Sequence, residues 1–139
     1  MTQPIALGLE NWPPRMTFSP AVRCGDFIFF AGLTAADDKR EMAGEGDIAL
    51  QTRVIFEKIG RLLAEAGASF ANIVETTEYF VWSDDYRKTA DVRREFFTYP
   101  YPAATGIPVE RLIHPKALIE IRAVAFLGGG PVTAPAPAP

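Results

Sequence analysis

The hydrophobic pattern begins with two apolar runs within residues 17–33, joined at Gly25-Asp26. Glycine followed by a polar residue is typical of a two-residue hairpin turn of type II′, so we expect a β-hairpin. The second run, FIFFA at 27–31, has no polar residue in alternation. Such a strand is expected to be covered on both faces. The polar, glycine-containing residues 34–46 predict a loop.

A helix is predicted between Asp47 and Gly67. Asp47 is a favoured N-cap residue, and Gly67 supplies a C-terminal stop. Between them, apolar residues recur at spacings of three and four, namely Ile48, Ile55, Ile59, Leu62, Leu63 and Ala66. This spacing places one apolar stripe on the helix, which therefore packs against a core.

Three further strands and a second helix are predicted in the remaining sequence. The β-branched and aromatic run IVETTEYFVW at 73–82 favours a strand. Ser83 is expected to cap a helix that runs to about Phe97, where YPYP ends it. Two more strands are expected at about 104–110 and 117–127. The order β-β-α-β-α-β-β predicts an α+β domain with two helices packed on one face of a mixed sheet.

This arrangement leaves the opposite face of the sheet uncovered. Phe29, Phe80, Val124 and their neighbours would expose an apolar patch beyond a few hundred Å². We therefore expect self-association into a closed homo-oligomer. The single domain is expected to span residues 1–127. The tail at 128–139, GGGPVTAPAPAP, is expected to be disordered because it cannot bury a core.

Composition narrows the class of protein. The chain has 139 residues, 48% of them hydrophobic, which fits one domain with its own core. A net charge of −3 argues against a nucleic-acid-binding surface. The N-terminus lacks the pattern of a signal peptide, and no apolar stretch approaches the roughly 20 residues needed to cross a bilayer. We expect a cytoplasmic protein that binds neither nucleic acid nor membrane.

Counting potential ligands argues against metal and cofactor chemistry. One histidine and one cysteine are too few for a zinc site, which needs about four ligands. His114 directly precedes Pro115, which predicts an extended or turn conformation and a loop histidine rather than a member of a catalytic triad. Glycine-rich nucleotide motifs are also absent from the sequence. We expect no metal and no cofactor.

Four segments in order carry a resemblance to a known family: TFSPAVRCGDFIFFAG, DIALQTRVIFEKIGRLLAEAGASFANIVETTEYFV, REFF with PAATG, and ALIEIRAVAF. Together they cover about residues 15–127 and resemble the Rid/YjgF family of reactive-intermediate deaminases. The resemblance implies the chorismate-mutase-like fold, a homotrimer with a central barrel, and small-molecule clefts between neighbouring subunits. LIHPKALIEIRAVAF further resembles the branch containing 2-aminomuconate deaminase, which suggests an aromatic or amino-acid catabolic pathway.

The resemblance also implies the site residues. The glutamate that orients a water in typical members matches Glu120, the expected catalytic residue. The arginine that pairs with a substrate carboxylate falls at Ala104, the tyrosine at Phe18, and the serine of the usual turn at Ala31. The implied substrate-binding positions are Phe18, Ala31, Gly32, Leu33, Ala104, Thr105 and Gly106, with Arg111 and Arg122 as possible anchors. The segments at Gly32 and Gly106 would supply backbone donors.

Two functions of different classes fit these residues. A methyl group cannot replace a bidentate guanidinium, so small imino acids such as 2-aminoacrylate are expected to bind poorly beside Ala104. The first function is a hydrolase for a more apolar or differently charged enamine, imine or related C–N compound, with Glu120 as general base. The alternative is a non-catalytic small-molecule-binding or regulatory trimer. A ribonuclease fits less well because the chain is acidic and lacks basic–aromatic interleaving.

Each charged candidate also has a purely structural interpretation. Glu120 and Arg122 share parity on a strand, so both side chains point to one face, where they could form an ion pair. Arg93 and Arg94 are also candidate anchors. Both lie near the end of the predicted second helix, however, where positive charge is favourable for the helix dipole.

Overall fold

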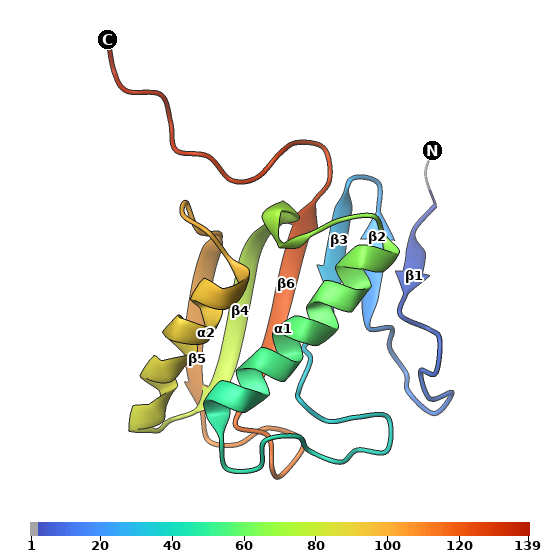
Figure 1. Cartoon of the computed structure of the whole chain (residues 1–139). Coiled ribbons are helices and arrows are strands. Elements are labelled where there is room, and N and C mark those ends of the chain that lie inside the picture. Colours follow the sequence, from blue (N-terminus) through green and yellow to red (C-terminus); the bar gives the residue numbers. More distant parts are fainter. Residues whose placement is uncertain (1–2) are drawn as a thin grey trace.

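The computed structural model describes residues 3–139 and shows a six-stranded mixed sheet with two α-helices on one face (Figure 1). The strands are β1 (Ile5–Leu7), β2 (Ala21–Cys24), β3 (Phe27–Phe30), β4 (Ile73–Val81), β5 (Ala103–Val109) and β6 (Ile119–Phe126). The helices are α1 (Ile48–Glu65) and α2 (Thr89–Phe96), with short 3₁₀ helices η1 (Phe70–Asn72) and η2 (Asp84–Lys88). The predicted α+β class is confirmed.

The strand order is β1-β2-β3-β6-β4-β5, and among these strands β4 and β5 pair in parallel while the other neighbours are antiparallel. Strand β1 was not predicted, because three residues are too few to show a period. It forms by adding to the edge of the hairpin, where Ile5 pairs with Arg23.

The hairpin of β2 and β3 forms where the sequence predicts it. Gly25 has a φ of +59°, the left-handed conformation that a type II′ turn requires at its first central residue. Within β3, Ile28 and Phe30 are buried, whereas Phe27 and Phe29 remain 42% and 45% exposed. The single chain therefore covers only one face of this strand, although the sequence predicts cover on both.

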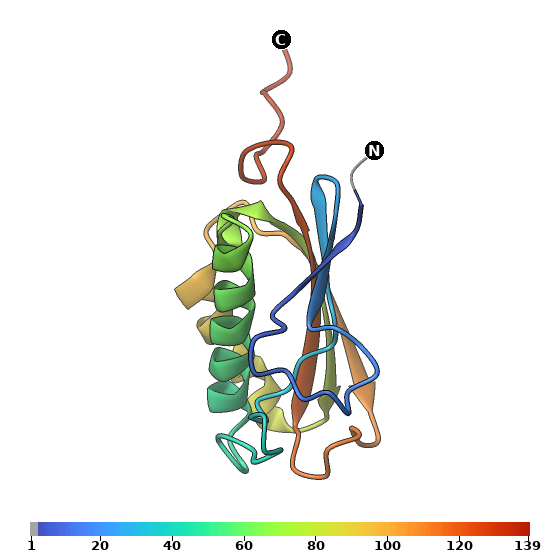
Figure 2. The same ribbon diagram turned by 90° about the vertical axis from the view of Figure 1, so that its right-hand side faces the viewer.

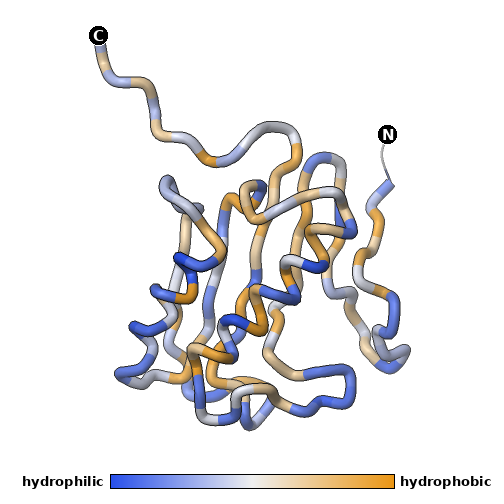
Figure 3. The backbone as a smooth tube through the Cα atoms, viewed as in Figure 1, coloured by the Kyte–Doolittle hydropathy of each residue, from blue (hydrophilic) through white to orange (hydrophobic). Residues whose placement is uncertain are grey.

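Helix α1 has the ends that the sequence predicts. The Asp47 carboxylate accepts from the Leu50 N–H at 3.0 Å, and Gly67 adopts a φ of +70°. The Ala68 N–H then donates to the Leu63 carbonyl at 2.8 Å, which completes a glycine-terminated Schellman cap. Charged and apolar residues alternate along α1 (Figure 3), and the apolar ones pack against the sheet.

The second helix differs from the prediction. Instead of one helix from Ser83 to Phe97, the chain forms η2 and then α2. The Ser83 side chain makes no capping hydrogen bond. The Thr89 hydroxyl donates to the Tyr86 carbonyl at 2.7 Å at the junction, where the tighter turn passes into α2. Val92 and Phe97 then anchor α2 in the core.

Both helices lie on the same side of the sheet, and the other side carries no helix (Figure 2). Along β6 the residues alternate between a buried set facing the helices, Ile119, Ile121, Ala123 and Ala125, and a partly exposed set, Glu120, Arg122, Val124 and Phe126. We call the side with the second set the open face.

The prediction that Phe80 lies on the open face is wrong. Phe80 is 3% exposed and stacks on Tyr86 of η2, with ring centroids 3.6 Å apart. Its cross-strand neighbour Ile119 belongs to the helix-facing set, and neighbouring residues in register point to the same side. Phe27 and Phe29 supply the exposed aromatic rings of the open face instead.

Residues 128–139 form neither helix nor strand and lead away from the sheet (Figure 1). Their disorder stays a prediction. Within residues 3–139, no helix has the length and apolar character needed to span a membrane.

Candidate active site

Glu120 lies on the open face with its carboxylate against Gly32. A Cβ on Gly32 would lie 3.0 Å from the Glu120 carboxyl carbon and would collide with Oε1. The absent side chain therefore leaves the space that the carboxylate occupies. Within residues 3–139, the Glu120 carboxylate has no hydrogen-bond or ion-pair partner. Burial raises the pKa of this carboxyl above its usual value.

The backbone around Gly32 is held on both sides. The Ala31 N–H donates to the Pro20 carbonyl, and the Leu33 N–H donates to the Ile121 carbonyl, both at 2.9 Å. Among the described residues, the Gly32 N–H has no acceptor, so it is the amide of this turn that can face a ligand. The Leu33 side chain is buried in the core, which removes Leu33 from the expected ligand contacts.

The course of the chain brings Phe18 near the Ala31-Gly32 turn. The Pro20–Ala31 hydrogen bond holds the segment that carries Phe18 beside the Ala31-Gly32 turn. Phe18 is 49% exposed and packs edge-on against Trp12, with ring centroids 5.5 Å apart. Because the exposed Phe18 ring carries no hydroxyl, the surface beside the Ala31-Gly32 turn is apolar.

The residues of β5 form a second half of the site. Ala104 and Gly106 pair in register with Thr76 and Glu78, which face the helices, whereas Thr105 pairs with Thr77. The resemblance to the family implies that all of these positions line one pocket with Glu120. In a single chain Thr105 shares the open face with Glu120, because Thr77 pairs with both Thr105 and Arg122, whereas Ala104 and Gly106 point to the helix-facing side.

The remaining candidate anchors are dispersed. Arg122 shares the open face with Glu120, as its parity predicts, but within residues 3–139 the two form no ion pair. Arg111 is exposed in the loop after β5. Arg94 pairs with Asp91 at 2.7 Å on the surface of α2. None of these three reaches Glu120 through a contact within the described residues.

Sequence reasoning missed a buried polar cluster next to β5. Glu78 is fully buried, its Oε2 accepts from the Tyr86 hydroxyl at 2.9 Å, and its Oε1 pairs with Arg93. Burial, followed by the nearby Glu78 charge, raises the pKa of Tyr86 to about 12. The Tyr86 hydroxyl lies 2.6 Å from where a Cβ on Gly106 would be. Strand parity links Glu78 to Phe80 but does not tell which face of the sheet the two occupy, so no signal in the sequence alone identifies this cluster.

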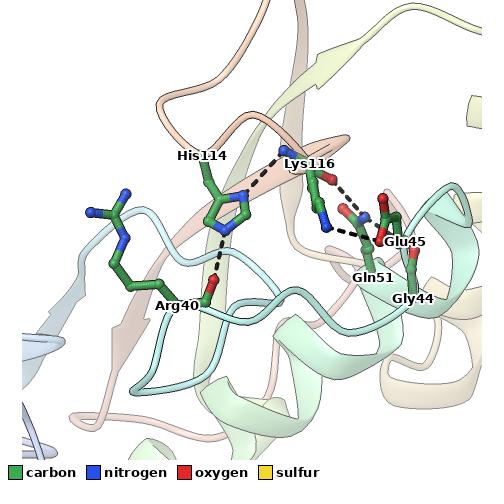
Figure 4. Close-up of polar contacts among 6 residues, drawn as sticks. All are labelled: Arg40, Gly44, Glu45, Gln51, His114 and Lys116. Atoms are coloured by element: carbon green, nitrogen blue, oxygen red, sulfur yellow. Dashed lines mark hydrogen bonds and ion pairs between the residues drawn. The ribbon is translucent and has the colours of Figure 1, made fainter.

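Four hydrogen bonds hold the loops that lead to the site. The Lys116 N–H donates to His114 Nδ1 at 3.1 Å, so the neutral ring donates through Nε2 to the Arg40 carbonyl at 2.8 Å (Figure 4). Buried Gln51 donates to the carbonyls of Gly44 and Lys116 at 3.1 and 3.0 Å. These bonds tie the loop after Leu33 to the loop before β6.

Lys58 of α1 supports the same region. Its ammonium donates to the Thr34 carbonyl at 2.7 Å and also to the Ala36 carbonyl. Burial lowers the pKa of Lys58 to about 8, while these two carbonyls favour the charged form. The residues directly after Gly32 are therefore fixed from the helix side.

Comparison with known proteins identifies the family of this chain. The family model described as endoribonuclease L-PSP matches residues 9–127. The chain belongs to this family, the Rid/YjgF proteins. A RutC family protein of Pyrococcus horikoshii is 38% identical over 119 residues, which are 84% of this chain and 93% of the relative.

Two further matches span nearly the whole Rid/YjgF domain. A protein of Acinetobacter baylyi named 3-aminoacrylate deaminase RutC is 31% identical over 127 residues, 91% of this chain and all of the relative. The crystal structure of a protein of unknown function from Pseudomonas aeruginosa has a TM-score of 0.84 at 27% identity and covers 97% of this chain and all of that one. The family resemblance and the fold inferred from the sequence are confirmed; placement in the 2-aminomuconate deaminase branch stays a prediction.

The Gly32–Glu120 contact gives a prediction about stability. Gly32→Ala should destabilise the protein by about 0.5–1.5 kcal/mol, because the added methyl forces the Glu120 side chain out of its present rotamer. The cost should shrink in a Glu120→Ala background, where the carboxylate is gone. Thermal unfolding of the two single variants and the double variant measures this coupling. An equal cost in both backgrounds would show that the two residues do not touch.

Proposed function

We propose that this Rid/YjgF protein hydrolyses a reactive enamine, imine or related C–N intermediate without a cofactor. The observation that carries the proposal is the half-buried Glu120 carboxylate, which has no partner within residues 3–139, has a raised pKa and lies against Gly32. An unpaired carboxylate of raised pKa is suited to take a proton from water. The relative named 3-aminoacrylate deaminase supports a substrate of this class.

The reaction needs only water and one base. Glu120 accepts a proton as a water oxygen forms its bond to the carbon of the C=N group, and the nitrogen takes up a proton. The resulting carbinolamine then collapses to a carbonyl, and the C–N bond breaks to release ammonia. An enamine first gains a proton at carbon to become the imine. The Gly32 N–H, which has no acceptor within residues 3–139, would stabilise negative charge as it develops.

We place the complete site between subunits of a homotrimer with a central barrel. Glu120 and Gly32 lie on the open face, whereas Ala104 and Gly106 lie on the helix-facing side of the edge strand β5. A cleft formed by the open face of one copy and the β5 edge of the next unites these halves. The small-molecule substrate would bind in this cleft.

The proposed substrate differs from small 2-imino acids. Ala104 provides no guanidinium from the strand, and Phe18 and Ala31 provide no hydroxyl, so apolar contact gains weight in recognition. We propose that the substrate is a largely apolar intermediate of an aromatic or amino-acid catabolic pathway. Phe97, Tyr101 and Ala90 add apolar surface beside Ala104.

A substrate panel tests this function. An amino-acid oxidase supplies imines from alanine, leucine and phenylalanine, and the acceleration of ammonia release by the protein is measured. We expect kcat/KM for the imines with large apolar side chains to exceed that for 2-iminopropanoate by at least about tenfold, because each added apolar contact contributes where the carboxylate clamp is weak. The oxidase with heat-inactivated protein is the control.

Two outcomes would count against the proposal. Higher turnover of 2-iminopropanoate than of the larger imines would contradict the predicted preference. No acceleration with any enamine or imine, while small molecules still bind, would support the alternative of a non-catalytic binding or regulatory trimer.

A further inference from the structure

A concave surface of about 200 Å³ lies between α2 and β5. It is lined by Ala90, Arg93, Arg94, Phe97, Tyr101, Pro102 and Ala104. Most of these residues are apolar, and the two that carry charge are both arginines. Arg94 pairs with Asp91, so Arg93 is the cation of this surface that can serve a ligand, and apolar walls with a few polar groups are typical of a site for a small organic molecule.

The position of the Arg93 guanidinium is fixed by two contacts with β4. It pairs with Glu78, and its Nη1 lies 3.5 Å from the Thr76 hydroxyl. Thr76 and Glu78 are the cross-strand neighbours of Ala104 and Gly106. The guanidinium is thereby held on the helix-facing side of β5, close to Ala104.

The ion pair orients this guanidinium rather than merely neutralising it. Glu78 is fully buried, whereas the Arg93 side chain is 21% exposed at the wall of the concave surface. A buried ion pair adds little net stability compared with apolar packing, but together with the Thr76 contact it holds the guanidinium in one position. A guanidinium has five N–H donors, and the contacts with Glu78 and Thr76 involve only Nη1 and Nη2. Donors therefore remain for a ligand.

We propose that Arg93 binds the carboxylate group of the ligand and that Ala104, by its small size, opens the space in which this carboxylate lies. The anchoring cation is then supplied by α2 instead of β5. The chemical class is a monocarboxylate with an apolar carbon chain, which would pack against Ala90 and Phe97. A phosphate dianion is disfavoured because the Glu78 charge lies directly behind the guanidinium. This inference rests on the proposed function only in placing the concave surface within the substrate cleft.

The charge shared with Glu78 also predicts that Arg93 holds a ligand carboxylate weakly. Because Glu78 offsets part of the Arg93 charge, a ligand carboxylate gains less than it would from an unpaired arginine. Small 2-imino acids are therefore bound poorly although a cation is present. Larger ligands add apolar contact with Phe97 to the same anchor.

The test measures binding without turnover. The probes are 2-oxobutanoate and its neutral amide, titrated by NMR into the full-length wild-type protein and into variants. Wild type should bind the carboxylate at least about tenfold more tightly than the amide. The double variant Glu78→Gln/Arg93→Gln leaves no lone buried charge and should lose this preference. Arg53→Gln is the matched control, because Arg53 pairs with Glu95 at 2.7 Å on the same helical layer outside the concave surface.

Two further variants strengthen the design. Arg93→Lys keeps a cation beside Glu78 and so protects the fold, but it removes the guanidinium fork and should weaken 2-oxobutanoate binding several-fold. Ala104→Arg, added to the double variant, should restore the preference for the carboxylate. Equal 2-oxobutanoate affinity in wild type, the double variant and Arg93→Lys would overturn the proposal. A protein that binds 2-oxobutanoate through Arg93 but hydrolyses no imine would count against the Glu120 mechanism alone.

Discussion

Glu120→Gln is expected to lower kcat on the preferred imine by about 10²–10⁴ while the protein stays folded. Glutamine keeps the shape of the side chain beside Gly32 but cannot accept a proton from water. The measurement is kcat for ammonia release together with the thermal unfolding midpoint. Arg53→Gln on α1 is the control, because Arg53 pairs with Glu95 at 2.7 Å on the helix side of the sheet. It should retain most of the activity.

The pH dependence of wild type provides an independent check. Glu120 must be ionised to act as a base, so activity should fall as the pH falls through its pKa, which burial raises. The acid limb of the profile should therefore lie above the usual pKa of a glutamate. This limb should be absent from the residual activity of Glu120→Gln.

The pH dependence of stability should differ from the one expected if Glu120 formed an ion pair. Burial disfavours the ionised Glu120, so the native state binds the proton more tightly than the unfolded state. Wild type consequently loses stability as the pH rises from the unfolded pKa through the raised native pKa. Glu120→Gln should remove this loss and raise the unfolding midpoint at pH 7 but not at pH 4. A variant that is active and less stable at pH 7 would instead identify Glu120 as an ion-pair partner.

Local signals predicted those parts of the fold whose causes are local. Asp47 and Gly67 bound α1 because a side-chain cap and a left-handed glycine act within one turn of the helix. Gly25 similarly specifies the β2–β3 turn. The break between η2 and α2 was not predicted, because the hydrogen bond of Thr89 to Tyr86 is one of several that this polar segment could form.

Features of the fold that depend on strand pairing could not be predicted from local sequence signals. Strand alternation separates Phe80 from Tyr79 but does not say which of the two faces the helices. Pairing of Phe80 with Ile119 decides it. The same pairing buries Glu78 beside Tyr86 and Arg93. Family motifs predict Glu120 and Ala104 as site positions, but only the register shows that one chain places them on opposite sides of its sheet.

The open face is the feature of the single chain that most needs a partner. Phe27 and Phe29 are 42% and 45% exposed, and the Phe27 ring lies 5.1 Å from the ring of Phe126. Strand β5 is exposed along most of its length at the sheet edge, and Ile107 adds an apolar side chain there. Exposed apolar surface and an unpaired strand edge both favour association with a further copy.

Phe29→Asp should therefore convert the proposed homotrimer to a monomer. An aspartate at this position would bury an unpaired charge in the interface, at a cost of several kcal/mol for each copy. Light scattering at micromolar concentration should give three times the 15.2 kDa chain mass for wild type and the single chain mass for the variant. Leu50→Asp on α1 is the matched control, since Leu50 is similarly exposed at 38% but lies on the helix side, and it should remain trimeric. Wild type with the mass of one chain would rule out the homotrimer and, with it, a cleft that joins Glu120 of one copy to Ala104 of the next.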